Sequence, residues 1–126
     1  MQDFHELRVW QKAHALTLAV YRTTVRFPKE ENYGLTAQTR RAAASVPANI
    51  AEGCGRGTNA ELRHFLQVAL GSASELEYHL LLARDLGHLS KAAWVSLNGD
   101  VLEVKRMLWG LIGKFQAGRQ KEPAKD

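Results

Sequence analysis

Apolar residues in the C-terminal third of the chain follow a spacing that only a long amphipathic helix satisfies. They recur at alternating intervals of three and four positions. The row consists of Trp94, Leu97, Val101, Val104, Leu108, Leu111 and Phe115. Because an α-helix turns once every about 3.6 residues, these side chains share one face. Ser90 is a suitable N-cap, so the pattern predicts a helix over residues 91–116.

A second long helix is predicted over residues 59–86, where both ends carry clear signals. Thr58 and Glu61 have the spacing of a capping box, in which side chains satisfy the first backbone N–H groups. Gly87 follows the last apolar position and can adopt the left-handed conformation that ends many helices. The start and the end of this helix are therefore both expected from the residues themselves.

Two further helices are predicted in the N-terminal half. Residues 6–26 carry two apolar stripes, and the helix is expected to end before Pro28, because the residue preceding a proline avoids the α conformation. Residues 34–52 are rich in alanine. Pro47 lies inside this segment and predicts a kink. The glycine-rich run 53–57 is expected to end the helix.

Four long helices joined by short connections predict an all-α fold, an antiparallel up-down-up-down four-helix bundle over residues 1–116. Residues 117–126 lack the apolar spacing and are expected to form a flexible tail. The chain has 126 residues, of which 45% are hydrophobic, enough for one packed domain. The charged first ten residues predict no secretory signal.

The same composition predicts a cytoplasmic protein without membrane contact. No apolar run reaches the roughly 18 residues that a membrane span needs. Cys54 is the single cysteine, so no internal disulfide framework exists. A reducing compartment is therefore expected.

Apolar residues outside the main rows predict self-association. Val95, Leu102 and Trp109 recur every seven positions beside the main row of their helix, and Leu70 and Leu81 lie outside the row of theirs. A helix in a monomeric bundle needs one broad apolar stripe. These five residues are therefore predicted to form an oligomer interface. The alternative is a wide stripe inside a tightly packed bundle.

Three motifs raise the question of catalysis. Glu61-x-x-His64 is a single half of a di-iron motif, and no histidine pair at helical spacing completes it. Cys54 lies near Arg56, which favours a thiolate, but no local signature supplies a base. The run 53–58 lacks the Lys-Ser/Thr ending of a phosphate-binding loop. We therefore predict a non-enzymatic protein without catalytic residues, cofactor or metal.

The glycine-rich run leaves one binding alternative open. It leads into a helix start, where backbone N–H groups together with Arg56 could hold one phosphate of a nucleic acid. The simpler interpretation is a turn between two helices, in which glycines permit a positive φ. The turn is the favoured interpretation.

A polar stripe joins the second and third predicted helices. Its members share faces at three-and-four spacing: Gln38, Arg41, Ser45, Asn49 and Glu52 on one helix, with Ser72, Glu75 and His79 on the next. We interpret all of these but His79 as a structural polar network in which Arg41 pairs with Glu52 or Glu75. The alternative is a polar pocket for a ligand.

Basic residues give a formal net charge of +4, which suits an anionic partner. The candidate nucleic-acid-binding residues are Arg22, Arg26, Lys29, Arg40, Arg56 and Arg63. The first four lie near the junction of the first two helices and the last two near the opposite pole. One chain therefore has no single basic patch, but a cyclic oligomer would repeat each cluster around a ring.

Several of these segments resemble a known family. They include Phe27-Pro28, Tyr33-Gly34-Leu35, Arg40-Arg41-Ala42, the run Asn49-Ile50-Ala51-Glu52-Gly53, and Gly71-Ser72 followed by Glu75-Leu76. From Phe4 to Phe115 the chain resembles the four-helix-bundle proteins encoded in intervening sequences of 23S ribosomal RNA genes. The accessory variability determinant of diversity-generating retroelements is similar to this family.

The resemblance implies an antiparallel four-helix bundle that assembles as a homopentameric ring. In the retroelement relative, it implies a basic pentamer that binds nucleic acid and a reverse transcriptase. It implies no catalytic residue. The function expected for this chain is therefore that of an accessory protein that binds RNA or DNA through the phosphate backbone. The alternatives are a protein-interaction scaffold without nucleic-acid binding, or an enzyme or small-ligand binder using the polar stripe.

Overall fold

The computed structural model describes residues 3–121 and side chains over residues 3–115. The elements in chain order are η1 (Phe4–Glu6), α1 (Arg8–Thr24), η2 (Lys29–Glu31), α2 (Leu35–Cys54), α3 (Asn59–Asp85) and α4 (Lys91–Lys121). Within the described residues there is no strand, which confirms the all-α prediction of four helices.

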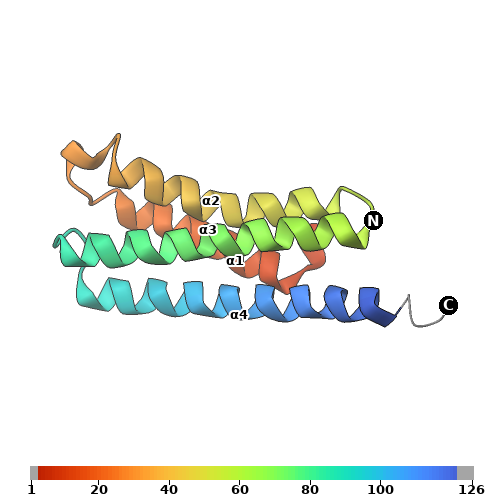
Figure 1. The fold of residues 1–126 in the computed structure, drawn as a ribbon. Coiled ribbons are helices and arrows are strands. Elements are labelled where there is room, and N and C mark those ends of the chain that lie inside the picture. The colour runs from red at the N-terminus through yellow and green to blue at the C-terminus, as the bar shows by residue number, and fades with distance from the viewer. Residues whose placement is uncertain (1–2, 122–126) are drawn as a thin grey trace.

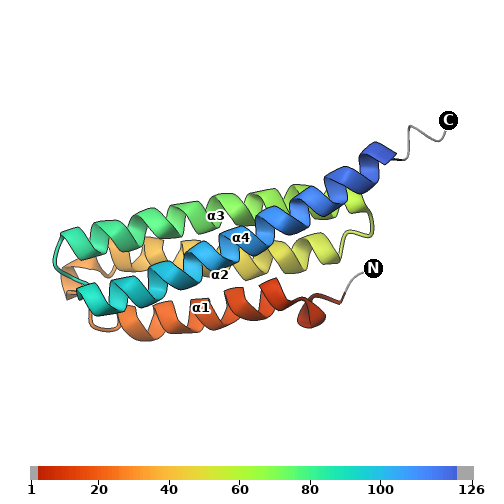
Figure 2. The ribbon, with the colours of Figure 1, turned by 90° about the horizontal axis from the view of Figure 1, so that it is seen from below.

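The four helices lie along one long axis (Figure 1). The α1–α2 and α3–α4 connections lie at one end of the molecule, and the α2–α3 connection lies at the other. Each helix packs against two others, so that α1 and α3 both contact α2 and α4. Figure 2 shows α4 crossing the bundle obliquely, with its C-terminal end extending beyond the other helices.

The predicted caps are present at the ends of α3 and at the start of α4. Thr58 Oγ1 accepts a hydrogen bond from the Glu61 N–H at 3.2 Å, and Ser90 Oγ accepts one from Ala93 at 3.1 Å. Gly87 has φ +80°, and the next N–H, from His88, donates to the Ala83 carbonyl at 2.9 Å. This is the Schellman arrangement, which satisfies carbonyls at the end of α3.

Four helix boundaries differ by two residues or more from those predicted. Helix α1 ends at Thr24 rather than at residue 26. Leu7 is extended and separates η1 from α1, so the helix begins at Arg8 rather than at residue 6. Helix α2 continues through Gly53 to Cys54. Helix α4 continues past residue 116 to Lys121, because all of the next residues except Gly118 are good helix formers and no proline occurs before Pro123. Residues 122–126 of the predicted tail lie outside the described residues.

Gly53 stays helical because α2 and α3 approach closely at this point. A Cβ atom at residue 53 would lie 2.9 Å from the Phe65 Cβ and 3.1 Å from Leu62 Cδ1. Real Cβ atoms essentially never come within 3.0 Å of such an atom, so the contact with Phe65 leaves no room for a side chain. The glycine is therefore needed to bring the two helices together, rather than to end α2.

Pro47 is accommodated in α2 by a hydrogen bond from α1. A proline lacks the N–H that would pair with the carbonyl four residues earlier, which is that of Ala43. Thr17 Oγ1 donates to this Ala43 carbonyl at 3.0 Å, while also lying 2.8 Å from the Ala13 carbonyl. Thr17 is buried, so α1 supplies the partner that α2 cannot supply to itself.

Candidate functional site

The predicted polar stripe lies along the contact between α2 and α3. The Oγ atoms of Ser45 and Ser72 are 2.8 Å apart, and Asn49 Nδ2 donates to the Ser45 carbonyl at 2.8 Å. Arg41 forms an ion pair with Glu75 across the two helices. Gln38 Oε1 accepts a hydrogen bond from Arg41 Nε at 3.1 Å. Six of the seven predicted network residues are therefore joined by hydrogen bonds or by this ion pair.

The seventh, Glu52, takes a different partner. Its Oε2 lies 3.0 Å from Arg56 Nε, so Arg41 is left to pair with Glu75. The Arg41 side chain is 54% exposed, which places this ion pair at the surface. An exposed pair contributes little to stability, typically about 0–1 kcal/mol. Six residues of the stripe are thus paired with one another and Glu52 with Arg56, whereas the buried Nδ1 of His79 has no hydrogen-bond partner among the described residues. Neither of the two cavities described below lies on the stripe.

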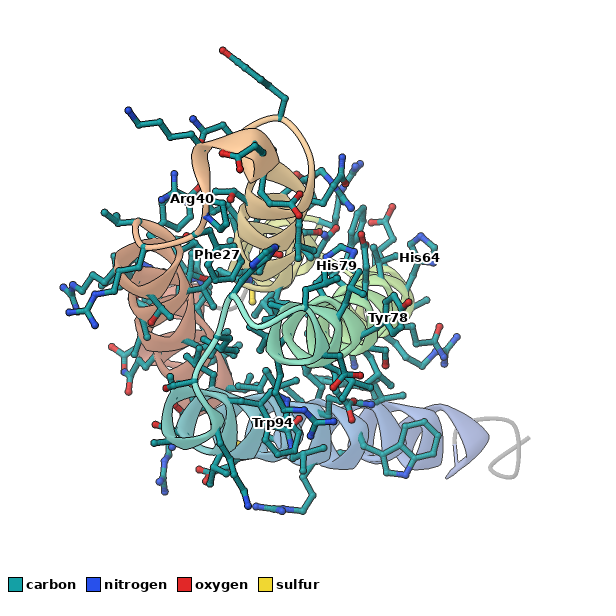
Figure 3. The ribbon with its side chains drawn as sticks, turned by 90° about the vertical axis from the view of Figure 1, so that its left-hand side faces the viewer. Phe27, Arg40, His64, Tyr78, His79 and Trp94 are labelled. Atoms are coloured by element: carbon teal, nitrogen blue, oxygen red, sulfur yellow. The ribbon has the colours of Figure 1, made fainter. Side chains whose placement is uncertain are left out.

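The basic residues at the α1–α2 end divide into two kinds. Arg22, Arg26 and Lys29 are exposed, and none has an ion-pair partner among the described residues. Arg40 instead bonds to α1: its Nε donates to Thr24 Oγ1 at 2.7 Å. Figure 3 shows Arg40 between α1 and α2.

The remaining two predicted residues lie at the start of α3, at the opposite end. Arg56 pairs with Glu52 and covers the Phe65 ring, with its Cζ 5.0 Å from the ring centroid. Arg63 is half-buried. The six candidates therefore do not form one patch on a single chain, as their positions in the sequence indicated.

The outer face of α4 carries a row of exposed apolar side chains among the described residues. The exposed fractions of Val95, Leu102 and Trp109 are 54%, 42% and 69%. Gly99 and Gly110 lie on the same helix, both exposed, and a Cβ atom added at either would meet nothing within 4 Å. Leu70 and Leu81, the other two predicted interface residues, are half-buried on α3.

Cys54 is buried and lines a cavity of about 200 Å³ next to Thr58 and Phe115. Burial raises the pKa of its thiol, which disfavours the reactive thiolate. Among the described residues, no group of three or more potential ligands could hold a metal ion.

Three basic side chains line a second cavity, and the sequence pattern did not predict that they lie together. This cavity is a groove of about 370 Å³ between the start of α1 and the C-terminal half of α4, and we call it the α1–α4 groove. Its lining is Leu7, Arg8, Val9, Arg106, Met107, Gly110, Leu111 and Lys114. The sequence pattern could not predict this cluster, because Arg8 is far from Arg106 and Lys114 along the chain.

Comparison with known proteins places the chain in a family. The family described as 23S rRNA-intervening sequence protein matches residues 5–110, most of the chain. The chain belongs to this family. The description of this family names no reaction. No helix of the described range is long and apolar enough to cross a membrane.

A solved structure supports this assignment. The family member resembles a crystal structure of a protein with unknown function from the S23 ribosomal protein family of Bacteroides thetaiotaomicron. The two share 25% sequence identity with a TM-score of 0.75, over 82% of this chain and 97% of that one. No curated protein matches the chain. The fold and family therefore rest on these findings, and the function has to be argued from the residues.

Proposed function

We propose that this family member is a non-enzymatic, cytoplasmic accessory protein that binds RNA or DNA through the phosphate backbone. The observation that carries the proposal is the group of exposed cations at the α1–α2 end. Arg22, Arg26 and Lys29 have no ion-pair partner within the described residues, so binding a phosphate would break no ion pair there. Such contacts recognise charge and spacing rather than base sequence.

The proposed assembly is an antiparallel bundle that forms a homopentameric ring. Its basis is the outer face of α4, where Val95, Leu102 and Trp109 are exposed. Exposed apolar rows of this kind mark contact surfaces. A ring would repeat the cation group once per subunit and so increase the affinity for a long polyanion without any new contact.

The direct test is fluorescence anisotropy of labelled single-stranded RNA and duplex DNA, titrated with salt. Each phosphate contact is expected to add about 0.7–0.9 to the slope of log affinity against log salt. The triple variant Arg22→Ala, Arg26→Ala, Lys29→Ala should weaken binding and reduce the slope. The matched control is the triple variant Arg8→Ala, Arg106→Ala, Lys114→Ala, which removes three exposed charges at the other end and should retain more of the binding.

Two results would contradict this function. One is the absence of binding at low salt and micromolar protein. The other is equal loss in the two variants, which would attribute binding to net charge alone. A protein-interaction scaffold is the second candidate, favoured by the exposed apolar face of α4. Light scattering tests the assembly separately: a pentamer has about five times the 14.1 kDa of one chain, and Leu102→Glu should abolish it.

A further inference from the structure

The α1–α4 groove combines an aliphatic floor with a cationic rim. Leu7, Met107 and Leu111 lie half-buried along its floor. Arg8, Arg106 and Lys114 also line it, and all three are exposed. Its volume of about 370 Å³ lies at the lower end of the range of ligand sites, which is about 300–1,000 Å³.

The charges of the groove, on Arg8, Arg106 and Lys114, have no ion-pair partner among the residues that the structure describes. No carboxylate lines the groove. Glu103 lies one turn away on α4, but it pairs with Lys12 at 3.0 Å. Three cations around an apolar surface therefore favour the binding of a negatively charged partner.

We propose that the α1–α4 groove binds an acidic amphipathic segment of a partner protein. Leucine-like side chains of the segment would occupy the aliphatic floor, while neighbouring carboxylates would contact Arg8, Arg106 and Lys114. A helical segment presents this combination when its apolar residues recur at three-and-four spacing. This inference is independent of the nucleic-acid function proposed above, which rests on residues at the opposite end of the bundle.

The chemistry of the floor separates this occupant from two others. Single-stranded nucleic acid is held by aromatic platforms on which bases stack, and no aromatic residue lines the groove. The exposed apolar row of a second copy, Val95, Leu102 and Trp109, supplies no carboxylate to pair with the three cations of the rim. An acidic partner meets both requirements of the groove at once.

The glycine at position 110 provides a sharp test. It is exposed on the groove side of α4, and an added Cβ would meet nothing within 4 Å. Gly110→Leu therefore adds its Cβ without a clash and places a larger side chain at the groove, and it should raise helix stability because glycine is a poor helix former. Gly99→Leu is the matched control, because Gly99 is equally open on the same helix but does not line the groove.

The probe is a fluorescein-labelled helical peptide of about 12 residues, with leucines at three-and-four spacing and glutamates beside them. We expect saturable binding by anisotropy that weakens with salt. Gly110→Leu should weaken binding about tenfold or more, a change of about 1.4 kcal/mol. Gly99→Leu should leave it unchanged. The double variant Arg106→Glu, Lys114→Glu should weaken the binding of the acidic peptide. It should strengthen the binding of the same peptide with lysines in place of the glutamates.

Besides a change in the mass of the assembly, four binding results would overturn the proposal. They are no binding of the acidic peptide to the wild-type protein at millimolar peptide, equal binding of the lysine peptide, unchanged binding by Gly110→Leu, and loss of RNA binding in Gly110→Leu with peptide binding retained. Circular dichroism and light scattering accompany every variant. If Gly110→Leu alters the mass of the assembly while Gly99→Leu does not, the groove is a contact between copies of the chain, and the proposal fails.

Discussion

The α2–α3 contact and the outer face of α4 both contain glycines, but the surroundings of these glycines differ. At the α2–α3 contact, Gly53 has neighbours so close that no Cβ fits, and serine hydroxyls pair across the two helices. On α4, Gly99 and Gly110 face open space beside exposed Leu102 and Trp109. The first surface is already packed within the chain. The second has the composition of a packed surface and lacks the partner.

The largest expected difference between the two surfaces is in the cost of removing a leucine. Leu66 on α3 is fully buried, and Leu66→Ala should lower the free energy of unfolding by about 2–5 kcal/mol through lost contacts and a cavity. Leu102→Ala on α4 should cost within about 0.5 kcal/mol in a single chain. Urea unfolding at several protein concentrations measures both.

The concentration dependence decides what the outer face of α4 does. If Leu102 lies between subunits, Leu102→Ala should reduce the stability gained on raising the protein concentration, because assembly stabilises the folded chain by mass action. The Leu66→Ala loss should be present at every concentration. A Leu102→Ala variant with unchanged mass and unchanged concentration dependence would remove this face from the interface.

The glycines give the next largest contrast. Gly53→Ala forces a Cβ into the 2.9 Å contact with Phe65 and should destabilise by about 1–3 kcal/mol, as overpacking does. Gly99→Ala has open space and should stabilise by up to about 1 kcal/mol through helix propensity. Thermal unfolding of the two variants checks the opposite signs. Equal effects would mean that helix propensity, rather than space, governs both positions.

A smaller effect is expected where Thr17 compensates for Pro47. Thr17→Val removes the hydroxyl that bonds the Ala43 carbonyl and should cost about 1–1.5 kcal/mol. Pro47→Ala restores the N–H that pairs with this carbonyl inside α2, so Thr17→Val should cost less in that background. A double-mutant cycle by urea unfolding measures this coupling. Strictly additive losses would show that the two residues act independently.

The sequence predicted the features that depend on local signals. Helical periodicity, the Thr58 and Ser90 caps and the left-handed Gly87 all arise from residues near one another in the chain. The same holds for the faces of the polar stripe, which made Arg41–Glu75 one of two predicted pairs. The exposed apolar row on α4 could also be identified from the sequence, because its spacing repeats along one helix.

Features that depend on contacts between different helices could not be predicted from local sequence signals. Gly53 looked like a helix end, because its role is set by the side chain of Phe65 on another helix. The α1–α4 groove stayed hidden for the same reason, since Arg8 and Lys114 meet only in the folded chain. Arg40 and Arg56 looked available for phosphates, but Thr24 and Glu52 hold them.

The smallest expected effect concerns a polar contact that holds two connections together at the α1–α2 end. Glu31 Oε1 accepts a hydrogen bond from the Leu35 N–H at 3.2 Å, and its Oε2 lies 3.1 Å from His88 Nε2. These contacts hold the pKa of Glu31 below its ordinary value of 4.5. The hydrogen bond from the Leu35 backbone N–H has the larger effect on this pKa, and the hydrogen bond with His88 has the smaller one. A lowered carboxyl pKa means that the folded state favours the charged form.

The sign of the pH dependence follows from this shift. The stabilisation is fully present above pH 4.5 and is lost as the pH falls through the lower pKa of the folded state. The urea midpoint of the wild-type protein should therefore fall more between about pH 5 and pH 3 than that of Glu31→Gln, which has no charge to lose. Glu30→Gln is the matched control, because Glu30 is exposed and makes no side-chain hydrogen bond among the described residues. If Glu30→Gln flattens the profile as much as Glu31→Gln, general repulsion among charges explains the acid loss, and the link between the two connections contributes nothing specific.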